Sequence, residues 1–365
     1  MNKYFIILAA AALTLSAACT KVSQDQTPDR KITFHAASYA PQTKGNASVL
    51  NDFTSFTCKA FLHADGYEST TQEFFGASGE TISPDNTSNP TYWAPSHDYY
   101  WPKSSQSYIN FIAWYDKNGD APISSTETAL SWANYVVATD DNLLFADEAW
   151  RYKDNEHDLY DMDSVTEGVP MLFHHALAQL TIEAAASPIS EGSTTWTVQL
   201  DTVKLAGVYN TGTLNLTNSD PGTANTPKAW VGANGNVWSS PSNATTITML
   251  ERCTSTGAET GPGALTSSPT VMLDGQSVLP QAVTNDMKLT VVYSIYYKYN
   301  GNLYAKERIK TETLLSAFSG SVTEWGMNKK ITYTININPK TTVVKIDPAV
   351  EEWVEVDAGS ATIAN

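Results

Sequence analysis

Strict alternation of apolar and polar residues is the feature that most constrains the fold of this chain. In its longest example, 289–299, every second residue is apolar or aromatic: Leu289, Val291, Tyr293, Ile295, Tyr297 and Tyr299. Side chains of a β-strand point alternately to opposite faces, so the pattern predicts a strand with one buried face. The following Asn300-Gly301-Asn302 tolerates positive φ and predicts a hairpin turn. Residues 303–311 are then the return strand.

The same period of two recurs along the chain in segments 32–36, 109–113, 178–184 and 331–337. Residues 143–145 form a short apolar run, which is typical of a strand buried on both faces. Clusters of Gly, Pro, Asn and Ser separate these segments, and no long amphipathic helical period is present. The sequence therefore predicts an all-β chain built from antiparallel β-sandwiches.

The length favours two domains. With 365 residues, 42% of them hydrophobic, the chain can bury two substantial cores. The stretch 169–182 ends one run of strand-like segments and opens a second, in which Leu180 and Ile182 alternate with Gln179 and Thr181. We therefore expect a first β-sandwich over residues 31–168 and a second over residues 169–365.

The N-terminus predicts export. A basic start at Lys3 precedes an apolar run over 4–15, and Ser16-Ala17-Ala18 places small residues before Cys19. This order is typical of a bacterial lipoprotein signal over residues 1–18, in which the Cys19 thiol is acylated and the chain is cut before it. Ser16 stands where such signals usually have Leu, so an ordinary secretory signal is the alternative. The run is too short to span a bilayer, and the polar segment 19–30 reads as a tether.

The charge balance disfavours nucleic-acid binding. The chain has 22 Lys and Arg against 38 Asp and Glu, a formal charge of −16. An acidic surface repels phosphate backbones and anionic lipid headgroups. Only 16% of residues are charged, which suits an extracellular β-protein better than a cytosolic enzyme.

No motif predicts an enzyme, a cofactor or a metal site. The chain has no phosphate-binding loop, nucleophile elbow or paired Cys-x-x-Cys motif. His174 and His175 are neighbours on an expected strand, so they face opposite ways and should serve packing and hydrogen bonding. The acidic segment 147–163 reads as a solvated loop. Cys58 alternates with polar residues and should be buried as a small hydrophobe, and a disulfide between Cys58 and Cys253 is left open.

One aromatic cluster permits two interpretations. It contains Trp93, Tyr99, Tyr100 and Trp101. Aromatic residues on strands usually pack in cores, and this is the interpretation we favour. The alternative is a platform on which flat rings stack against sugars.

Several pieces, taken in order, resemble the fimbrillin family, the pilus subunits of Bacteroidales-type anaerobes. They are Cys19, 31–36, Thr43-Lys44-Gly45, Tyr100-Trp101-Pro102, 111–115, 143–146, 169–182, Leu279-Pro280-Gln281, 325–337 and Trp353. The resemblance implies two tandem transthyretin-like (Greek-key) β-sandwiches. It also implies a structural or adhesive component of a fimbria, as stalk, tip or anchor subunit, exported as an outer-membrane lipoprotein to the cell surface.

The resemblance also implies a mode of assembly. A protease acting in the loop after the first strand usually cuts fimbrillins after Arg, and the matching residues here are Lys44 and Gly45. Release of an edge-forming strand at 32–36 would expose a groove that another subunit fills by strand addition. The expected donor is the C-terminal segment from residue 350 onward, with Val350, Trp353, Val354 and Val356. The expected partners are therefore other fimbrial subunits and the outer-membrane lipid.

A second hypothesis belongs to a different class of function. A lipid-anchored surface protein that captures glycans for polysaccharide uptake would also be acidic, aromatic and rich in β-strands. Its platform would be the cluster around Trp93 and Trp101, and surface glycans would be its partners.

Overall fold

The structure is a computed structural model. It describes residues 31–38, 54–66, 69–85, 92–102, 107–152, 168–186, 189–218, 227–228, 230, 238–251, 264–300, 302–317, 322–340 and 344–352. These residues form β-strands and one 3₁₀ turn, η2 (Leu315–Ala317), and contain no α-helix. No helix among them is long and apolar enough to cross a membrane. The all-β prediction is confirmed.

The N-terminal part of the chain builds a ten-stranded sheet. In spatial order its strands are β15 (Pro227–Lys228), β10 (Glu148–Tyr152), β6 (Tyr108–Asp116), β9 (Leu143–Ala146), β11 (Val169–His175), β1 (Phe34–Ser38), β5 (Tyr92–Pro95), β4 (Glu80–Asp85), β2 (Phe56–His63) and β3 (Thr71–Glu73). β6 also pairs with β2, from Thr57↔Trp114 to His63↔Tyr108. The sheet therefore closes into a ring, with Phe34, Phe111 and Phe173 buried inside it.

The C-terminal part forms a sandwich of two sheets. One sheet has the order β17 (Thr270–Val278), β12 (Ala178–Ala186), β22 (Lys329–Ile337) and β23 (Val344–Glu352). The other has the order β20 (Asn302–Leu314), β19 (Lys288–Tyr299), β14 (Thr194–Thr217), β8 (Ala129–Val136) and β7 (Ser124–Thr126), while β13 (Ile189–Glu191) and β16 (Trp238–Glu251) pair with β14. A short pair, β18 (Gln281–Ala282) and β21 (Glu324–Trp325), forms a separate two-stranded sheet.

The alternating residues of these strands fill the sandwich core as predicted. On β22, Ile331, Tyr333, Ile335 and Ile337 are at most 2% exposed. They share a core with Leu180 and Ile182 of β12, Val198 and Leu200 of β14, and Leu289 and Val291 of β19. The hairpin after Tyr299 is also confirmed, since Tyr299 pairs with Asn302 and Asn300 has a φ of 47°.

Strand direction departs from the prediction of purely antiparallel sheets. β1 pairs with β11 in parallel, and β12 pairs with β22 in parallel. Parallel neighbours need a long crossover between them, and many strands separate the members of each pair in the sequence. The prediction was wrong because periodicity reports which face of a strand is buried but carries no information on strand direction.

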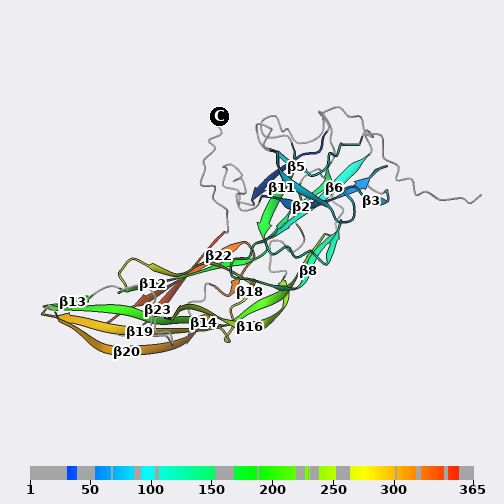
Figure 1. The fold of residues 1–365 in the computed structure, drawn as a ribbon. Helices are drawn as coiled ribbons and strands as arrows, with labels where there is room; N and C mark the ends of the chain where they lie inside the picture. Colours follow the sequence, from blue (N-terminus) through cyan, green and yellow to red (C-terminus); the bar gives the residue numbers. More distant parts are fainter. Residues whose placement is uncertain are drawn as a thin grey trace, which may run out of the picture.

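The chain does not pass from the ten-stranded sheet to the sandwich at the predicted domain boundary, residue 168. β11 begins at Val169 but still belongs to the ten-stranded sheet, and the chain enters the sandwich only with β12. β8 precedes residue 168, yet it pairs with β14 of the sandwich. Figure 1 shows the result, an elongated molecule with the ten-stranded sheet at one end and β13, β19 and β20 at the other.

Candidate assembly site

β1 is an internal strand of the ten-stranded sheet. All five of its residues pair with β11, from Phe34↔Val169 to Ser38↔Phe173. On the other side Phe34 pairs with Trp93 of β5, and the Ile32 amide donates to the Tyr99 carbonyl at 2.9 Å. The expectation of an edge-forming strand was therefore wrong, because a strand first in sequence is here inserted between β11 and β5.

Phe34 anchors β1 in an aromatic core. It is completely buried and meets Phe111 edge-to-face with ring centroids 5.4 Å apart, while Phe56 and Phe75 each lie at 6.3 Å. Ile32 and Ala36, on the same face, are also buried. Full burial of such side chains is worth about 1.5–3 kcal/mol each, so a short strand is held firmly.

Gly168 allows the chain to pass close to β1. It has a φ of 142°, and the Cβ that any other residue would carry there lies 2.8 Å from the Phe34 carbonyl carbon. The next residue, Val169, donates its amide to the Thr33 carbonyl at 2.8 Å. Gly168 therefore permits the first β1–β11 contact to form.

Removing β1 from this position would open the closed ring. The backbone of β11 would lose its partner over five residues, and Phe56, Phe75 and Phe111 would lose their contact with Phe34. An extended segment of alternating apolar residues would meet both needs, because strand addition satisfies the backbone while the side chains fill the pockets. The position of β1 is thus a candidate acceptor groove.

The predicted donor segment lies partly within the fold. Val350 belongs to β23 and pairs with Ile331 of the same chain, so it is not part of a free tail. β23 ends at Glu352, opposite Lys329. Trp353, Val354 and Val356 lie outside the described residues, as do Cys19, Lys44 and Gly45. A donor segment that leaves the pairing of β23 intact therefore has to follow Glu352.

The comparisons with known proteins bear on this arrangement. A family model described as fimbrillin-like matches residues 59–353. The chain belongs to the fimbrillin-like family. A solved fimbrial protein from Bacteroides vulgatus is 14% identical, with a TM-score of 0.50, over 89% of this chain and 100% of that one, which supports a shared fold.

Two further solved structures are similar to this chain, with TM-scores below 0.5. A proposed cell adhesion protein from Bacteroides uniformis is 16% identical with a TM-score of 0.47, over 90% of this chain and 100% of that one. Another, from Bacteroides ovatus, is 12% identical with a TM-score of 0.43, over 90% of this chain and 98% of that one. The comparison with curated proteins gives no match.

The aromatic cluster of this fimbrillin-like chain forms part of the core. Trp93 and Trp101 are 6% and 9% exposed, and Trp93 packs on Phe56 with centroids 5.4 Å apart. The rings of Tyr99 and Phe75 pack with centroids 4.4 Å apart, and the backbone of Tyr100 forms an isolated antiparallel β-bridge with Lys31. Buried indoles cannot stack on a sugar, so Trp93 and Trp101 do not form an exposed platform, whereas Tyr99 and Tyr100 are half-buried.

The Tyr99 hydroxyl is also engaged. It donates to Glu80 at 2.8 Å, and Ser96 and His97 bind the same carboxylate. Burial and the neighbouring carboxylate raise the pKa of Tyr99 to about 12. Burial by itself would raise the pKa of Glu80, but the hydrogen bonds from Ser96, Tyr99 and His97 lower it overall. This network holds β4 to the segment after β5.

The two adjacent histidines are structural, as predicted. His174 Nε2 lies 2.8 Å from Asp147 Oδ1, and its ring stacks on Phe145. His175 Nδ1 lies 3.0 Å from Asn142 Oδ1. Among the described residues no group of His, Cys, Asp or Glu is arranged to hold a metal ion. Cys58 is buried, as predicted, and burial raises the pKa of its thiol.

A third core joins the ring to the sandwich. It packs Trp114 of β6 and Phe145 of β9 against Trp132 of β8 and Leu214 of β14. The Trp238 indole donates to the Ala176 carbonyl at 2.7 Å, where the chain passes between the sheets. The two units are therefore coupled through buried contacts, which the division at residue 168 did not anticipate.

A buried ion pair crosses the same junction. His63 Nε2 of β2 lies 2.6 Å from Glu127 Oε1, in the turn between β7 and β8, and His63 Nδ1 lies 3.2 Å from the Ser69 carbonyl oxygen. The Glu127 carboxylate and the Ser69 carbonyl are both hydrogen-bond acceptors, and each of them faces one ring nitrogen of His63. Thr71 and Asn110 also donate to Glu127. Burial alone would raise the pKa of Glu127, and these partners lower it overall.

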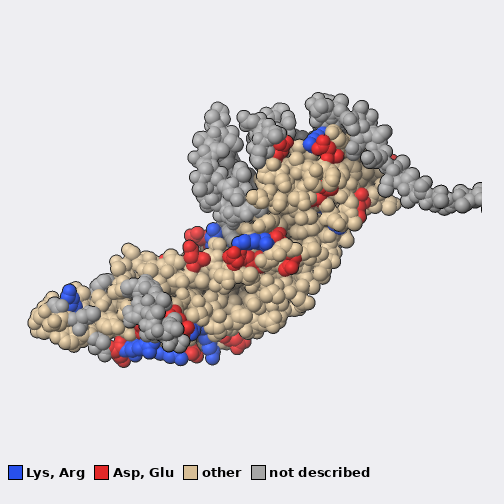
Figure 2. Space-filling view, in the orientation of Figure 1, with Lys and Arg blue, Asp and Glu red and all other residues tan. Residues whose placement is uncertain are grey.

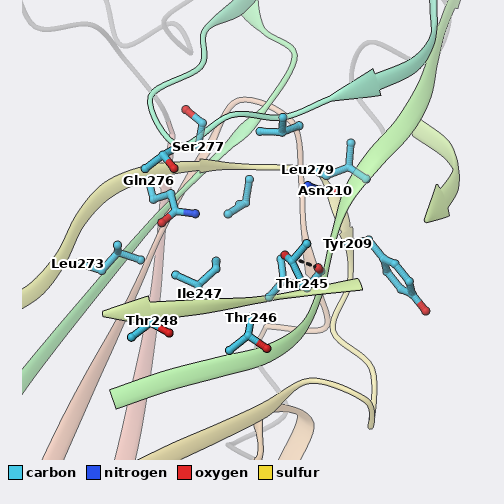
Figure 3. Close-up of a pocket in the computed structure, with 14 residues that line it drawn as sticks. Tyr209, Asn210, Thr245, Thr246, Ile247, Thr248, Leu273, Gln276, Ser277 and Leu279 are labelled. Atoms are coloured by element: carbon cyan, nitrogen blue, oxygen red, sulfur yellow. Dashed lines mark hydrogen bonds between the residues drawn. The ribbon is translucent and has the colours of Figure 1, made fainter. Parts of the chain in front are cut away.

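A lateral cavity lies between the two sheets of the sandwich, with a volume of about 460 Å³. Figure 3 shows Ile247 of β16 and Gln276 of β17 facing it from opposite walls. Its other lining groups are mostly hydroxyl and aliphatic: Val137, Thr139, Val208, Tyr209, Asn210, Thr245, Thr246, Thr248, Leu273, Ser277, Val278 and Leu279. None of the described residues that line this cavity carries a charged side chain.

Sequence reasoning missed the purpose of the Leu279-Pro280-Gln281 motif. The Gln281 side chain accepts from the Tyr209 amide at 3.0 Å and donates to the Tyr209 carbonyl at 2.9 Å. It thus acts as one rung of a ladder between β18 and β14. A Gln directly after Pro280 was the signal present in the sequence. Its partner, Tyr209, is too distant in the sequence to be identified from it.

Proposed function

We propose that this chain is a fimbrial subunit that assembles by strand addition, with the position of β1 as its acceptor groove and residues 353–365 as its donor. The observation that carries this proposal is that β1 is a short internal strand that closes a ring. Its loss leaves a defined gap between β11 and β5. Membership of the fimbrillin-like family supports a structural role at the cell surface.

The proposal includes the finer features that the sequence predicts. Cys19 carries the lipid anchor in the outer membrane, and cleavage after Lys44 frees β1. Each unit keeps the transthyretin-like plan expected of the family. The stalk, tip and anchor roles differ in whether a subunit is cut and whether it donates a tail. A cut chain with a working tail fits a stalk subunit.

Limited trypsin treatment followed by light scattering tests the assembly mechanism. The precursor should be monomeric, and the product cut after Lys44 should form higher oligomers. Lys44→Gln should prevent both the cleavage and the formation of higher oligomers. Deletion of residues 353–365 should allow cleavage after Lys44 but abolish the formation of higher oligomers, while β23 keeps its pairing with β22. A cut chain that stays monomeric, or a tail-deleted chain that still polymerises, removes strand addition from the account.

Mass spectrometry of the envelope-extracted protein tests the anchor. Acyl mass on Cys19 at the mature N-terminus is the expected result. Cys19→Ser should leave the precursor uncut. In the Lys44→Gln chain, which the proposed protease cannot cut at this position, a mature N-terminus other than Cys19, without lipid, would favour the ordinary secretory signal.

A further inference from the structure

Three aromatic rings form a row across neighbouring strands at the end of the sandwich away from the ten-stranded sheet. Trp196 of β14 lies opposite Tyr297 of β19, and Tyr297 lies opposite Tyr304 of β20. The ring centroids are 5.2 Å apart in the first pair and 5.1 Å apart in the second, where the rings stack with an interplanar angle of 17°. Directly opposite residues share one face of a sheet, so the three rings line a single surface.

The three rings lie on the same face of the β14–β19–β20 sheet as the sandwich core, nearer to the β19–β20 hairpin. Tyr293 and Ile295, on the same face of β19, are completely buried. Towards the hairpin the face becomes exposed, since Tyr304 is 42% exposed and Tyr299, next in the alternation, is 46% exposed. Figure 1 places β13 and the β19–β20 hairpin at this end. β23 ends at Glu352 opposite Lys329, at the start of β22, whereas the tip lies beyond the other end of that strand.

A carboxylate lies beside the rings on the same face. Glu307 of β20 is opposite Ile295, so its side chain points to the ring-bearing side. Burial raises the pKa of Tyr293, and the nearby charge of Glu307 raises it further. Glu307 is itself exposed. The surface thus combines flat apolar faces, phenolic hydroxyls and one strong hydrogen-bond acceptor.

We propose that this surface, the ring row Trp196–Tyr297–Tyr304 with Glu307, binds a neutral oligosaccharide. The apolar CH face of a pyranose ring matches an exposed aromatic ring, and the hydroxyls at its edge match a carboxylate and phenols. Sugar units along a chain repeat at a regular spacing, which suits a row of rings better than a single ring. The site lies at the opposite end of the molecule from β5, the strand that carries the buried Trp93.

Charge favours a neutral sugar over other occupants. The chain carries a formal charge of −16, and Glu307 adds a local negative charge, so an acidic polysaccharide or an anionic membrane is repelled. Figure 2 shows uncharged surface over much of this end on the face in view, with a basic patch near the tip and both basic and acidic groups along the lower edge. The exposed rings are tyrosines with polar hydroxyls, which suit a hydrated ligand.

Affinity electrophoresis of the uncut monomer tests the inference. The gels contain a soluble β-glucan, a mannan or a soluble starch, with polygalacturonate as the anionic control. At least one neutral polysaccharide should retard the protein. Tyr304→Ala should weaken this binding about five- to tenfold. Tyr296→Ala is the matched control. Tyr296 precedes Tyr297 on β19, so its side chain lies on the opposite face of the sheet, and its loss should leave binding unchanged. Tyr304→Phe keeps the ring and should retain most of the affinity.

Circular dichroism should show that each variant is folded. Absence of retardation by every neutral polysaccharide, or equal loss with Tyr304→Ala and Tyr296→Ala, overturns the inference. Concentration-dependent dimerisation that Tyr304→Ala abolishes, without sugar binding, would make this surface an interface between copies and also overturn it. Since the uncut monomer is used, failure here leaves strand addition untouched, and failure of strand addition leaves this site untouched.

Discussion

The Cβ position of Gly168 lies 2.8 Å from the carbonyl carbon of Phe34, closer than two such atoms normally approach. The contact joins the residue before β11 to the strand that closes the ring. Any side chain at residue 168 therefore pushes against the backbone of β1. Because β1 is the strand whose release the proposed assembly requires, this contact should control how firmly β1 is held.

Replacement of Gly168 by Ala should loosen β1. The φ of 142° is unfavourable for any residue with a Cβ, and the new methyl group must displace the Phe34 backbone. We expect a loss of more than about 2 kcal/mol, seen as a lower melting temperature and faster hydrogen exchange in β1. Gly66→Ala is the control, since Gly66 also has positive φ but has no atom within 4 Å of its Cβ position. Similar exchange in β1 for both variants would remove the steric explanation.

The buried face of β22 gives a second prediction. Ile335 is completely buried between the sheets, whereas Thr334 is half-buried on the opposite face. Ile335→Ala should cost about 2–5 kcal/mol and lower the melting temperature clearly, because it leaves a cavity. Thr334→Ala should change the melting temperature little. Equal effects from the two substitutions would contradict the assigned face.

The His63–Glu127 pair should contribute more than a surface ion pair. Glu127→Gln leaves the buried His63 ring without its carboxylate partner, which should cost about 3 kcal/mol in chemical unfolding. Asp140→Asn removes the exposed partner of Lys117, a pair 2.8 Å apart, and should change the stability far less, because solvent screens an exposed pair. The comparison isolates burial as the cause. A cost for Glu127→Gln no larger than for Asp140→Asn would mean that the junction does not depend on this pair.

A cluster of acidic groups at the end of β6 predicts pH-dependent stability. The Tyr135 hydroxyl donates to Asp141 at 2.9 Å and to Asp116 at 3.2 Å. Burial, opposed by the Asn118 amide and reinforced by Asp141, raises the pKa of Asp116 to about 6, and burial also raises the pKa of Asp141. The Lys117–Asp140 pair and Asp120 are the other charges nearby.

The sign follows from proton binding. A carboxyl whose pKa is higher in the folded state stabilises the fold below its unfolded pKa of about 4, and this stabilisation is lost as pH rises through about 6. The melting temperature should therefore fall between about pH 4 and pH 7 through this group. Asp116→Asn should flatten that slope and raise stability at pH 8 by about 1 kcal/mol, since solvent screens a half-buried group. An unchanged slope in Asp116→Asn would assign the pH dependence to other residues.

Strand faces could be predicted from the sequence, whereas strand neighbours could not. The period of two identified the buried side of 331–337 and the hairpin at Asn300, because both are local properties. The pairing of Phe34 with Val169 depends on residues far apart in the sequence, and periodicity does not encode it. For the same reason the internal position of β1 and the crossing of β8 into the sandwich were missed.

The candidate sites show the same division. An aromatic cluster in sequence does not reveal which rings are exposed, so Trp93 and Trp101 were open to a binding interpretation that burial removes. The row formed by Trp196, Tyr297 and Tyr304 combines residues from three strands and becomes visible only in the assembled sheet.

The contact made by the tail within an oligomer tests strand addition most directly. A photoreactive benzoylphenylalanine at residue 354 of the chain cut after Lys44 would be cross-linked in oligomers mixed from heavy-isotope and light chains, and the products mapped by mass spectrometry. Strand addition predicts cross-links between different chains, from residue 354 to β11 or β5 at the place that β1 has left. Cross-links confined to the same chain, or cross-links between chains that leave β1 paired with β11, would contradict it.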